Sequence, residues 1–286
     1  MKAVILCAAK EEDLFPFSET KPTPLMPVIG KPIVEHNIDG LKQNGVEKCY
    51  LVTNHLEKEI ETYFNDVESV ETVHQDQIDG TASALNTCSF IEDDIIVMNG
   101  DVIISEKDIE NLVKKFENTG ETSILATDEN SPEKFGVLSI KNDEVVEITE
   151  KPEKPENPLI NTGIYAFNKN IFNKINRLEN EKTSLTDAIS LEVQEEGARF
   201  ELVQDYWIDI GTCEKLWKAD QIKRQYEITK TKISEDAEVS EKAEIKGKTI
   251  VEKGAEIHPG AVIKGKTFIG KNTVIEPNTT IKNSTI

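Results

Sequence analysis

Residues 233–286 read ISEDAEVSEKAEIKGKTIVEKGAEIHPGAVIKGKTFIGKNTVIEPNTTIKNSTI, and a β-branched apolar residue recurs there every six positions. The series runs from Ile233 to Ile281 without a miss, and a small residue, Ala or Thr, follows each member four positions later. A period of six fits neither a helix nor a hairpin meander. It is typical of a solenoid in which each hexad forms one face and three hexads complete a coil, with β-branched side chains filling the interior. The stretch therefore predicts a parallel β-helix over residues 227–286. Its last hexad ends without an obvious cap, so we expect the natural protein to continue.

Upstream of the solenoid, short runs rich in Val and Ile alternate with helical stretches. The runs are residues 2–6, 49–53, 94–99, 123–127 and 159–167, and the helical stretches are 32–44, 55–65, 81–90, 106–118 and 184–196. This alternation predicts an α/β domain over residues 1–226, with a Rossmann-like, mostly parallel sheet and helices on both faces. Because ligands bind beyond the carboxyl ends of parallel strands, the residues that follow each run are where a site is expected.

Composition excludes several functional classes. The formal net charge of −20 over 286 residues argues against nucleic acid, which needs a basic surface. No apolar run approaches the roughly 18 residues of a membrane span, and the N-terminal apolar stretch indicates a first strand, so we expect a soluble cytoplasmic protein. The widely spaced cysteines indicate neither a zinc site nor a disulfide framework. They are Cys7, Cys49, Cys88 and Cys213.

The end of the first run carries the most informative motif. Residues 6–16 read LCAAKEEDLFP and residues 21–32 read KPTPLMPVIGKP. Five further segments follow: Gln75 before GTASA at 80–84, NGD at 99–101, EKP at 150–152, NTG at 161–163 and WID at 207–209. In this order and spacing the chain resembles the sugar-1-phosphate nucleotidylyltransferases, many of which append a left-handed β-helix of hexapeptide repeats. The resemblance covers the α/β domain and the solenoid.

The resemblance implies a reaction in which a sugar-1-phosphate attacks the α-phosphorus of a nucleoside triphosphate and expels pyrophosphate. The implied ligands are a nucleoside triphosphate or nucleotide sugar and a sugar-1-phosphate, with Mg²⁺ as cofactor. It assigns the nucleotide to Ala8, Ala9, Gln75, Gly80 and Thr81, the sugar to Gly136, Glu150, Asn161 and Thr162, the sugar phosphate to Lys151, and the metal to Asp101 and Asp209. Each motif alone also has a structural interpretation: a turn at Asp101, a solvated ion pair at Glu150–Lys151 or a helix cap at Gly80–Thr81.

The phosphate-binding loop departs from the family pattern. That pattern, A-A-G-x-G-[TE]-R-L-x-P followed by P-K-P, has glycines at Ala9 and Glu11, an arginine at Asp13 and a lysine at Thr23. Glycine backbone N–H groups, Arg and Lys bind a triphosphate, whereas a carboxylate at about 4 Å repels one by up to roughly 4 kcal/mol in a partly screened site. We therefore predict impaired or absent catalysis, with Lys21 as a possible partial substitute.

Three functions remain open at this stage. The first is a nucleotide and sugar-phosphate binding protein with impaired catalysis, acting as a regulatory or partner subunit. The second is an active nucleotidylyltransferase with a remodelled loop. The third is a β-helix acyltransferase, which needs a basic residue between coils and for which the solenoid offers His258 alone. The residue pattern specifies neither the nucleobase nor the sugar.

The outward face of the solenoid indicates an interface. Residues 18 apart stack in successive coils, so one face presents Ile250, Phe268 and Ile286, whereas the other two carry Glu. We expect this stripe to be buried against another subunit, in a homo-oligomer or a hetero-oligomer with an active paralogue, or against the α/β domain. Scattered exposed hydrophobic residues are the alternative.

Overall fold

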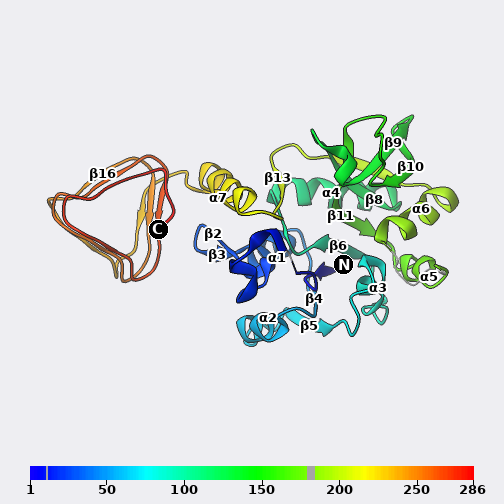
Figure 1. The fold of residues 1–286 in the computed structure, drawn as a ribbon, viewed down its shortest axis with the longest axis horizontal. Helices are drawn as coiled ribbons and strands as arrows, with labels where there is room; N and C mark the ends of the chain where they lie inside the picture. Colours follow the sequence, from blue (N-terminus) through cyan, green and yellow to red (C-terminus); the bar gives the residue numbers. More distant parts are fainter. Residues whose placement is uncertain (11, 179–183) are drawn as a thin grey trace. The chain divides into compact units, whose positions relative to one another are not determined.

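The computed structural model describes residues 1–10, 12–178 and 184–286, which form two compact units (Figure 1). The first unit comprises Met1–Leu25 and Ile33–Gly211, and the second comprises Met26–Pro32 and Thr212–Ile286. Helix α7 (Cys213–Glu227) and a short N-terminal segment are thus grouped with the solenoid. The domain boundary expected after residue 226 stays a prediction.

A nine-stranded mixed sheet forms the centre of the first unit. Its strands are β1 (Lys2–Leu6), β4 (Cys49–Thr53), β5 (Val70–His74), β6 (Ile95–Asn99), β8 (Ser123–Asp128), β9 (Gly136–Lys141), β10 (Glu144–Glu150), β11 (Leu159–Phe167) and β12 (Arg199–Leu202). The main path is β10-β9-β11-β6-β1-β4-β5, with β8 between β11 and β12. Strands β6, β1, β4 and β5 run parallel, which is the Rossmann-like half, whereas β11 is antiparallel to β6, β8 and β9. The predicted α/β fold is confirmed.

Helices cover both faces of this sheet, as predicted. They are α1 (Ile33–Gln43), α2 (Glu57–Phe64), α3 (Thr81–Asn86), α4 (Glu106–Thr119), α5 (Ile171–Ile175) and α6 (Leu185–Glu195). Alternation along β1 separates two cores: Ala3 and Ile5 belong to the cluster with α1, α2 and α4, and Val4 to the one with α3, α5 and α6. None of the helices in the described part of the chain is both long and apolar enough to cross a membrane.

The C-terminal repeats form a parallel β-helix, consistent with the left-handed hexapeptide type (Figure 1). The strands are β14 (Lys232–Ile233), β15 (Glu238–Val239), β16 (Glu244–Lys246), β17 (Thr249–Val251), β18 (Glu256–Ile257), β19 (Val262–Lys264), β20 (Thr267–Ile269), β21 (Val274–Ile275) and β22 (Thr280–Lys282). They make three parallel sheets of three strands, and the register pairs residues 18 apart, such as Ile245 with Ile263 and Ile263 with Ile281. The interior is lined by the β-branched residues that recur every six positions from Val251 to Ile281.

The corners of the solenoid depend on glycine. Gly254, Gly260 and Gly265 have positive φ and lie against Asn272, Asn278 and Asn283, each 18 residues later. A Cβ atom on Gly260 would lie 2.3 Å from Oδ1 of Asn278, closer than real Cβ contacts allow. The close stacking of the coils therefore leaves no room for a Cβ atom there, and glycine adopts the left-handed backbone without strain.

The apolar stripe on the outside of the solenoid is only partly buried. Phe268 is 5% exposed, and its ring lies over Gly30 of the hairpin β2 (Pro27–Val28) and β3 (Lys31–Pro32), in the same compact unit. Asp220 of α7 links the hairpin to the solenoid, because its carboxylate accepts hydrogen bonds from the Ile29 N–H and from the Thr285 hydroxyl of the last coil. Ile286 is 51% exposed, so contact of the stripe with another subunit stays a prediction.

Candidate functional site

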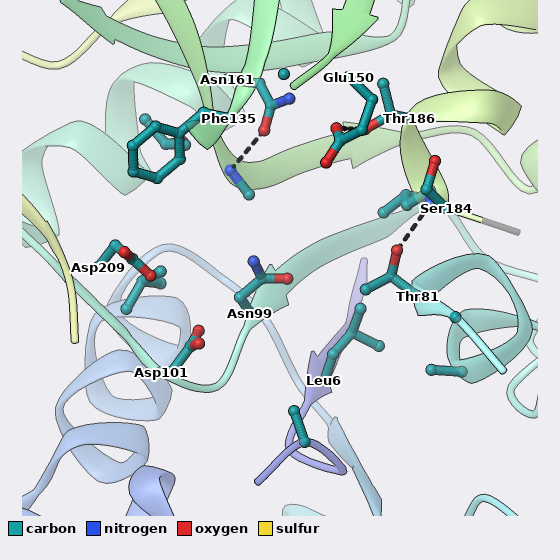
Figure 2. A pocket seen from close by; sticks show the side chains of 18 of the residues that line it. Leu6, Thr81, Asn99, Asp101, Phe135, Glu150, Asn161, Ser184, Thr186 and Asp209 are labelled. Carbon is teal, nitrogen blue, oxygen red and sulfur yellow. Dashed lines mark hydrogen bonds between the residues drawn. The ribbon is translucent and has the colours of Figure 1, made fainter. Parts of the chain in front are cut away.

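A cavity of about 490 Å³ lies at the carboxyl ends of the parallel strands of the first unit (Figure 2). Its walls come from the ends of β1 and β6, the start of α3, and strands β9, β10 and β11. This is the edge of the sheet at which a ligand was expected. The residues assigned from the sequence that line it are Ala8, Ala9, Gln75, Gly80, Thr81, Asp101, Gly136, Glu150, Lys151, Asn161, Thr162 and Asp209.

The side expected to hold the nucleotide is built around the start of α3. Gln75 is 2% exposed, and its amide lies 3.4 Å from Oδ1 of Asp79, so it is held close to the turn that precedes the helix. Gly80 has φ of 130° and opens α3. The Thr81 hydroxyl accepts a hydrogen bond of 2.8 Å from the Leu185 N–H, which ties α3 to α6. Backbone N–H groups at such a helix start can receive an anion or a polar ring edge.

The side expected to hold the sugar is a network of buried polar groups. Oδ1 of Asn161 accepts hydrogen bonds from the Gly163 N–H at 3.1 Å and from the Tyr165 hydroxyl at 2.9 Å. Burial raises the pKa of Tyr165, so its hydroxyl stays a donor. A Cβ on Gly136 would lie 2.2 Å from Nδ2 of Asn161, so glycine is needed for the amide to occupy this place.

Two neighbouring side chains complete the sugar side. Oε2 of Glu150 accepts a hydrogen bond of 2.8 Å from the Thr186 hydroxyl, which orients the carboxylate (Figure 2). Thr162 is 1% exposed, and its hydroxyl donates to the Leu125 carbonyl. That hydroxyl is therefore already engaged within the sheet, although Thr162 contributes to the cavity wall.

Of the two candidate metal ligands, Asp209 ends a strand and Asp101 lies in the turn directly before the strand that pairs with it. Strand β13 (Trp207–Asp209) pairs antiparallel with β7 (Val102–Ile104), and the Ile210 N–H donates to the Asp101 carbonyl at 2.8 Å. The strands thereby bring Asp101 and Asp209 to the same side of the cavity (Figure 2). Two carboxylates fit Mg²⁺, which commonly binds one or two protein carboxylates and completes its shell with phosphate and water. Within residues 1–10, 12–178 and 184–286 there is no group of three or more His, Cys, Asp or Glu that could hold an ion without a substrate.

Only part of the altered phosphate loop lines the cavity, and this part includes Ala9. Asp13 is exposed in a 3₁₀ turn at Glu12–Leu14, and Thr23 is 2% exposed in another at Thr23–Leu25. Neither is among the described residues that line the cavity, and Glu11 lies outside the described residues. Lys10 pairs with Glu19 at 2.8 Å, and this hydrogen bond raises the pKa of the lysine.

Sequence reasoning missed several residues of the cavity wall. Phe135 and Trp207 form an edge-to-face aromatic pair with ring centres 5.8 Å apart, and the Trp207 indole donates to the Thr162 carbonyl. Lys134 and Thr186 also line the cavity. Phe135 and Lys134 directly precede Gly136, and the order of the motifs could have drawn attention to them.

The fold and the cavity define a class of protein: a nucleotidyltransferase-like α/β unit with an appended β-helix. The family model of the nucleotidyl transferases matches residues 2–226. The chain therefore belongs to the nucleotidyl transferase family, and its similarity to the relatives below places it with the sugar-1-phosphate nucleotidylyltransferases.

Two archaeal relatives resemble the chain over most of its length. The bifunctional protein GlmU of Methanocaldococcus jannaschii is 33% identical over 257 residues, which is 88% of this chain and 60% of the relative. A bifunctional sugar-1-phosphate nucleotidylyltransferase/acetyltransferase of Sulfurisphaera tokodaii is 34% identical over 260 residues, 88% of this chain and 62% of the relative. The chain thus spans about 60% of the length of these relatives.

A solved structure supports the same fold. The crystal structure of a putative glucose-1-phosphate thymidylyltransferase from Bacillus anthracis superposes with a TM-score of 0.74 at 28% identity. The similarity covers 80% of this chain and 98% of that one.

Proposed function

We propose that the cavity binds a nucleotide together with a sugar-1-phosphate, or the corresponding nucleotide sugar, and that nucleotidyl transfer is impaired or absent. One observation carries the proposal. The residues assigned to base, sugar and metal line one cavity, whereas Asp13 and Thr23, at the positions of the triphosphate-binding Arg and Lys, lie off its wall. We further propose that the protein acts as a regulatory or partner subunit in an oligomer.

The residues of the cavity would divide the work of binding as follows. Gln75 and the N–H groups at Gly80 and Thr81 would receive the base, and Glu150 and Asn161 would bind sugar hydroxyls. Lys151 would neutralise the phosphate of the sugar. Asp101 and Asp209 would hold Mg²⁺, which when bound supplies neutralisation of phosphate charge.

Positioning and charge neutralisation provide almost all the acceleration in phosphoryl transfer, and the altered loop removes both for the triphosphate. A missing cation leaves negative charge on the β- and γ-phosphates unbalanced while pyrophosphate departs. Lys10, which lies three positions before Asp13, is engaged with Glu19. The transition state depends more on the triphosphate-binding Arg and Lys than ground-state binding does. Ligand binding would therefore be retained although catalysis is lost.

An active enzyme with a remodelled loop is the alternative, and it is favoured by the intact remainder of the cavity. In that case Lys21, which is exposed, would take the place of the lost lysine. An acyltransferase reaction in the solenoid has less support. The described coils contain a single histidine, His258. Its Nε2 atom lies 3.4 Å from Oε2 of Glu256 in a shallow surface hollow.

A pyrophosphate-release assay with Mg²⁺ over a panel of nucleoside triphosphates and sugar-1-phosphates, paired with calorimetric titration of the same ligands, tests the proposal. We expect binding without turnover near the usual enzyme range of about 1–10³ s⁻¹. The variant with Ala9→Gly, Glu11→Gly, Asp13→Arg and Thr23→Lys should bind triphosphate more tightly. Turnover of the unmodified protein in the ordinary range would favour the alternative, and absence of binding to every ligand would refute both.

A further inference from the structure

Two lysines, Lys134 and Lys151, line the cavity although they lie 17 positions apart in the sequence. Lys134 ends a 3₁₀ turn (Pro132–Lys134) that is separated from β9 by Phe135, and Lys151 directly follows β10. The strands are antiparallel, with Gly136 opposite Glu150, and the Lys151 N–H donates to the Phe135 carbonyl at 2.9 Å. The pairing continues past the strand ends, where Phe135 lies opposite Lys151, and both lysines line the cavity.

The positive charges of the two lysines differ in how far neighbouring carboxylates balance them. Nζ of Lys151 lies 3.9 Å from Oε1 of Glu150, so part of its charge is balanced within the protein. Lys134 makes no ion pair or side-chain hydrogen bond with any residue that the structure describes. Lys134 therefore supplies positive charge that Glu150 does not offset.

The backbone at Lys151 is in an uncommon conformation. Its φ is +44°, in the left-handed region that long side chains rarely adopt. Such a conformation persists where neighbouring contacts hold it, here the hydrogen bond to Phe135, and it is found more often at ligand-binding turns. The turn thus directs residues 150 and 151 to the cavity at some conformational cost.

The negative charge at the cavity wall favours a second cation near a bound phosphate. Asp101, Glu150 and Asp209 contribute three carboxylates, and Mg²⁺ would offset the aspartate pair. A phosphate monoester near Glu150 would still meet a carboxylate and one partly balanced lysine. Two lysines bring two positive charges and six N–H donors to one phosphate, which balances its charge better than one lysine can.

We propose that Lys134 is a second phosphate-binding residue, which together with Lys151 binds the phosphate group of a sugar phosphate at the β9–β10 edge of the cavity. The inference rests on the proposed function. It adds a binding residue, Lys134, and an orientation for the bound sugar phosphate. The sugar phosphate would enter with its phosphate toward the strand ends and its hydroxyls toward Glu150 and Asn161. Because Lys134 is exposed, its contribution would be sensitive to salt.

Calorimetric titration with glucose-1-phosphate and mannose-1-phosphate tests this role. The variants are Lys134→Gln, Lys151→Gln and a matched control, Lys141→Gln, which removes an exposed lysine of β9 that is not among the described lining residues. A charge-assisted hydrogen bond corresponds to a loss of about tenfold or more in affinity, expected for Lys134→Gln and not for the control. Lys134→Arg should retain most of the affinity, and high salt should narrow the difference between Lys134→Gln and the unmodified protein.

The outcomes separate the inference from the function on which it rests. If Lys134→Gln binds like the control while Lys151→Gln is weakened, Lys134 has no such role and the proposed function stands. If neither sugar phosphate nor any nucleotide binds the unmodified protein, the proposed function fails and the inference with it. If Lys134→Gln and Lys141→Gln unfold at the same temperature as the unmodified protein, a difference in affinity does not come from loss of folded protein.

Discussion

Replacing Gly136 with alanine should destabilise the α/β unit through one identifiable clash. A Cβ at this position would lie 2.2 Å from Nδ2 of Asn161, whereas ordinary contacts begin at 3.4 Å. The amide must therefore move by about 1 Å or rotate away. Oδ1 of the same amide accepts hydrogen bonds from the Gly163 N–H and the Tyr165 hydroxyl, and these would lengthen or break.

The size of the effect follows from those two hydrogen bonds. Tyr165 is 4% exposed and Gly163 is buried, so water cannot readily replace the lost acceptor. A buried donor without a partner costs about 1–3 kcal/mol, which gives about 2 kcal/mol as a minimum if both bonds are lost. For a unit of this size, the melting temperature should fall by about 4 °C or more.

A double-mutant cycle with Asn161→Ala isolates the clash. Asn161→Ala alone removes the same acceptor and should cost a similar amount. In that background the new methyl group has space, and the remaining contact within 3.4 Å is the end of the flexible Glu150 side chain at 3.2 Å. Gly136→Ala should then cost little, with a coupling free energy of about 2 kcal/mol measured by urea or thermal unfolding. Equal destabilisation by Gly136→Ala in both backgrounds would refute the steric argument.

Two further predictions concern the stability of the solenoid and the change in the free energy of unfolding at acidic pH. Gly260→Ala should cost about 2 kcal/mol, from left-handed strain and displacement of Asn278, whereas Gly197→Ala, which also has positive φ but nothing within 4 Å of a new Cβ, should cost only about 1 kcal/mol of strain. Equal losses in thermal unfolding monitored by circular dichroism would contradict the stacking argument. The hydrogen bond from Arg177, with a second from a neighbouring lysine, lowers the pKa of Glu195 from 4.5 to about 2. The stabilisation by this carboxylate is therefore complete above pH 4.5 and is lost as the pH falls toward 2. Urea unfolding of Glu195→Gln should show a shallower loss of stability across this range, and a slope equal to that of the unmodified protein would count against the ion pair.

Several features were readable from the sequence because they depend on near neighbours along the chain. Each coil of the solenoid packs on residues 18 positions away, so a period of six reports the fold directly. Strands β1, β4 and β6 were recognisable as buried apolar runs, and motifs at their ends could be assigned to one sheet edge. The hairpin β9–β10 and the strands β5, β7, β12 and β13 were not predicted, because strands that are very short or carry polar residues lack a clear period.

Other features depend on contacts between distant parts of the chain and needed the tertiary structure. No local pattern shows that Gly30 covers Phe268, because this contact joins residues more than 200 positions apart. The position of Asp13 and Thr23 away from the cavity wall also depends on how the turns of residues 12–25 fold. The sequence by itself determined the βαβ pattern, the solenoid and the order of the motifs. Only the tertiary structure decided which side chains share the cavity, because antiparallel pairing of β9 with β10 is what brings residues near 135 and near 151 to one cavity wall.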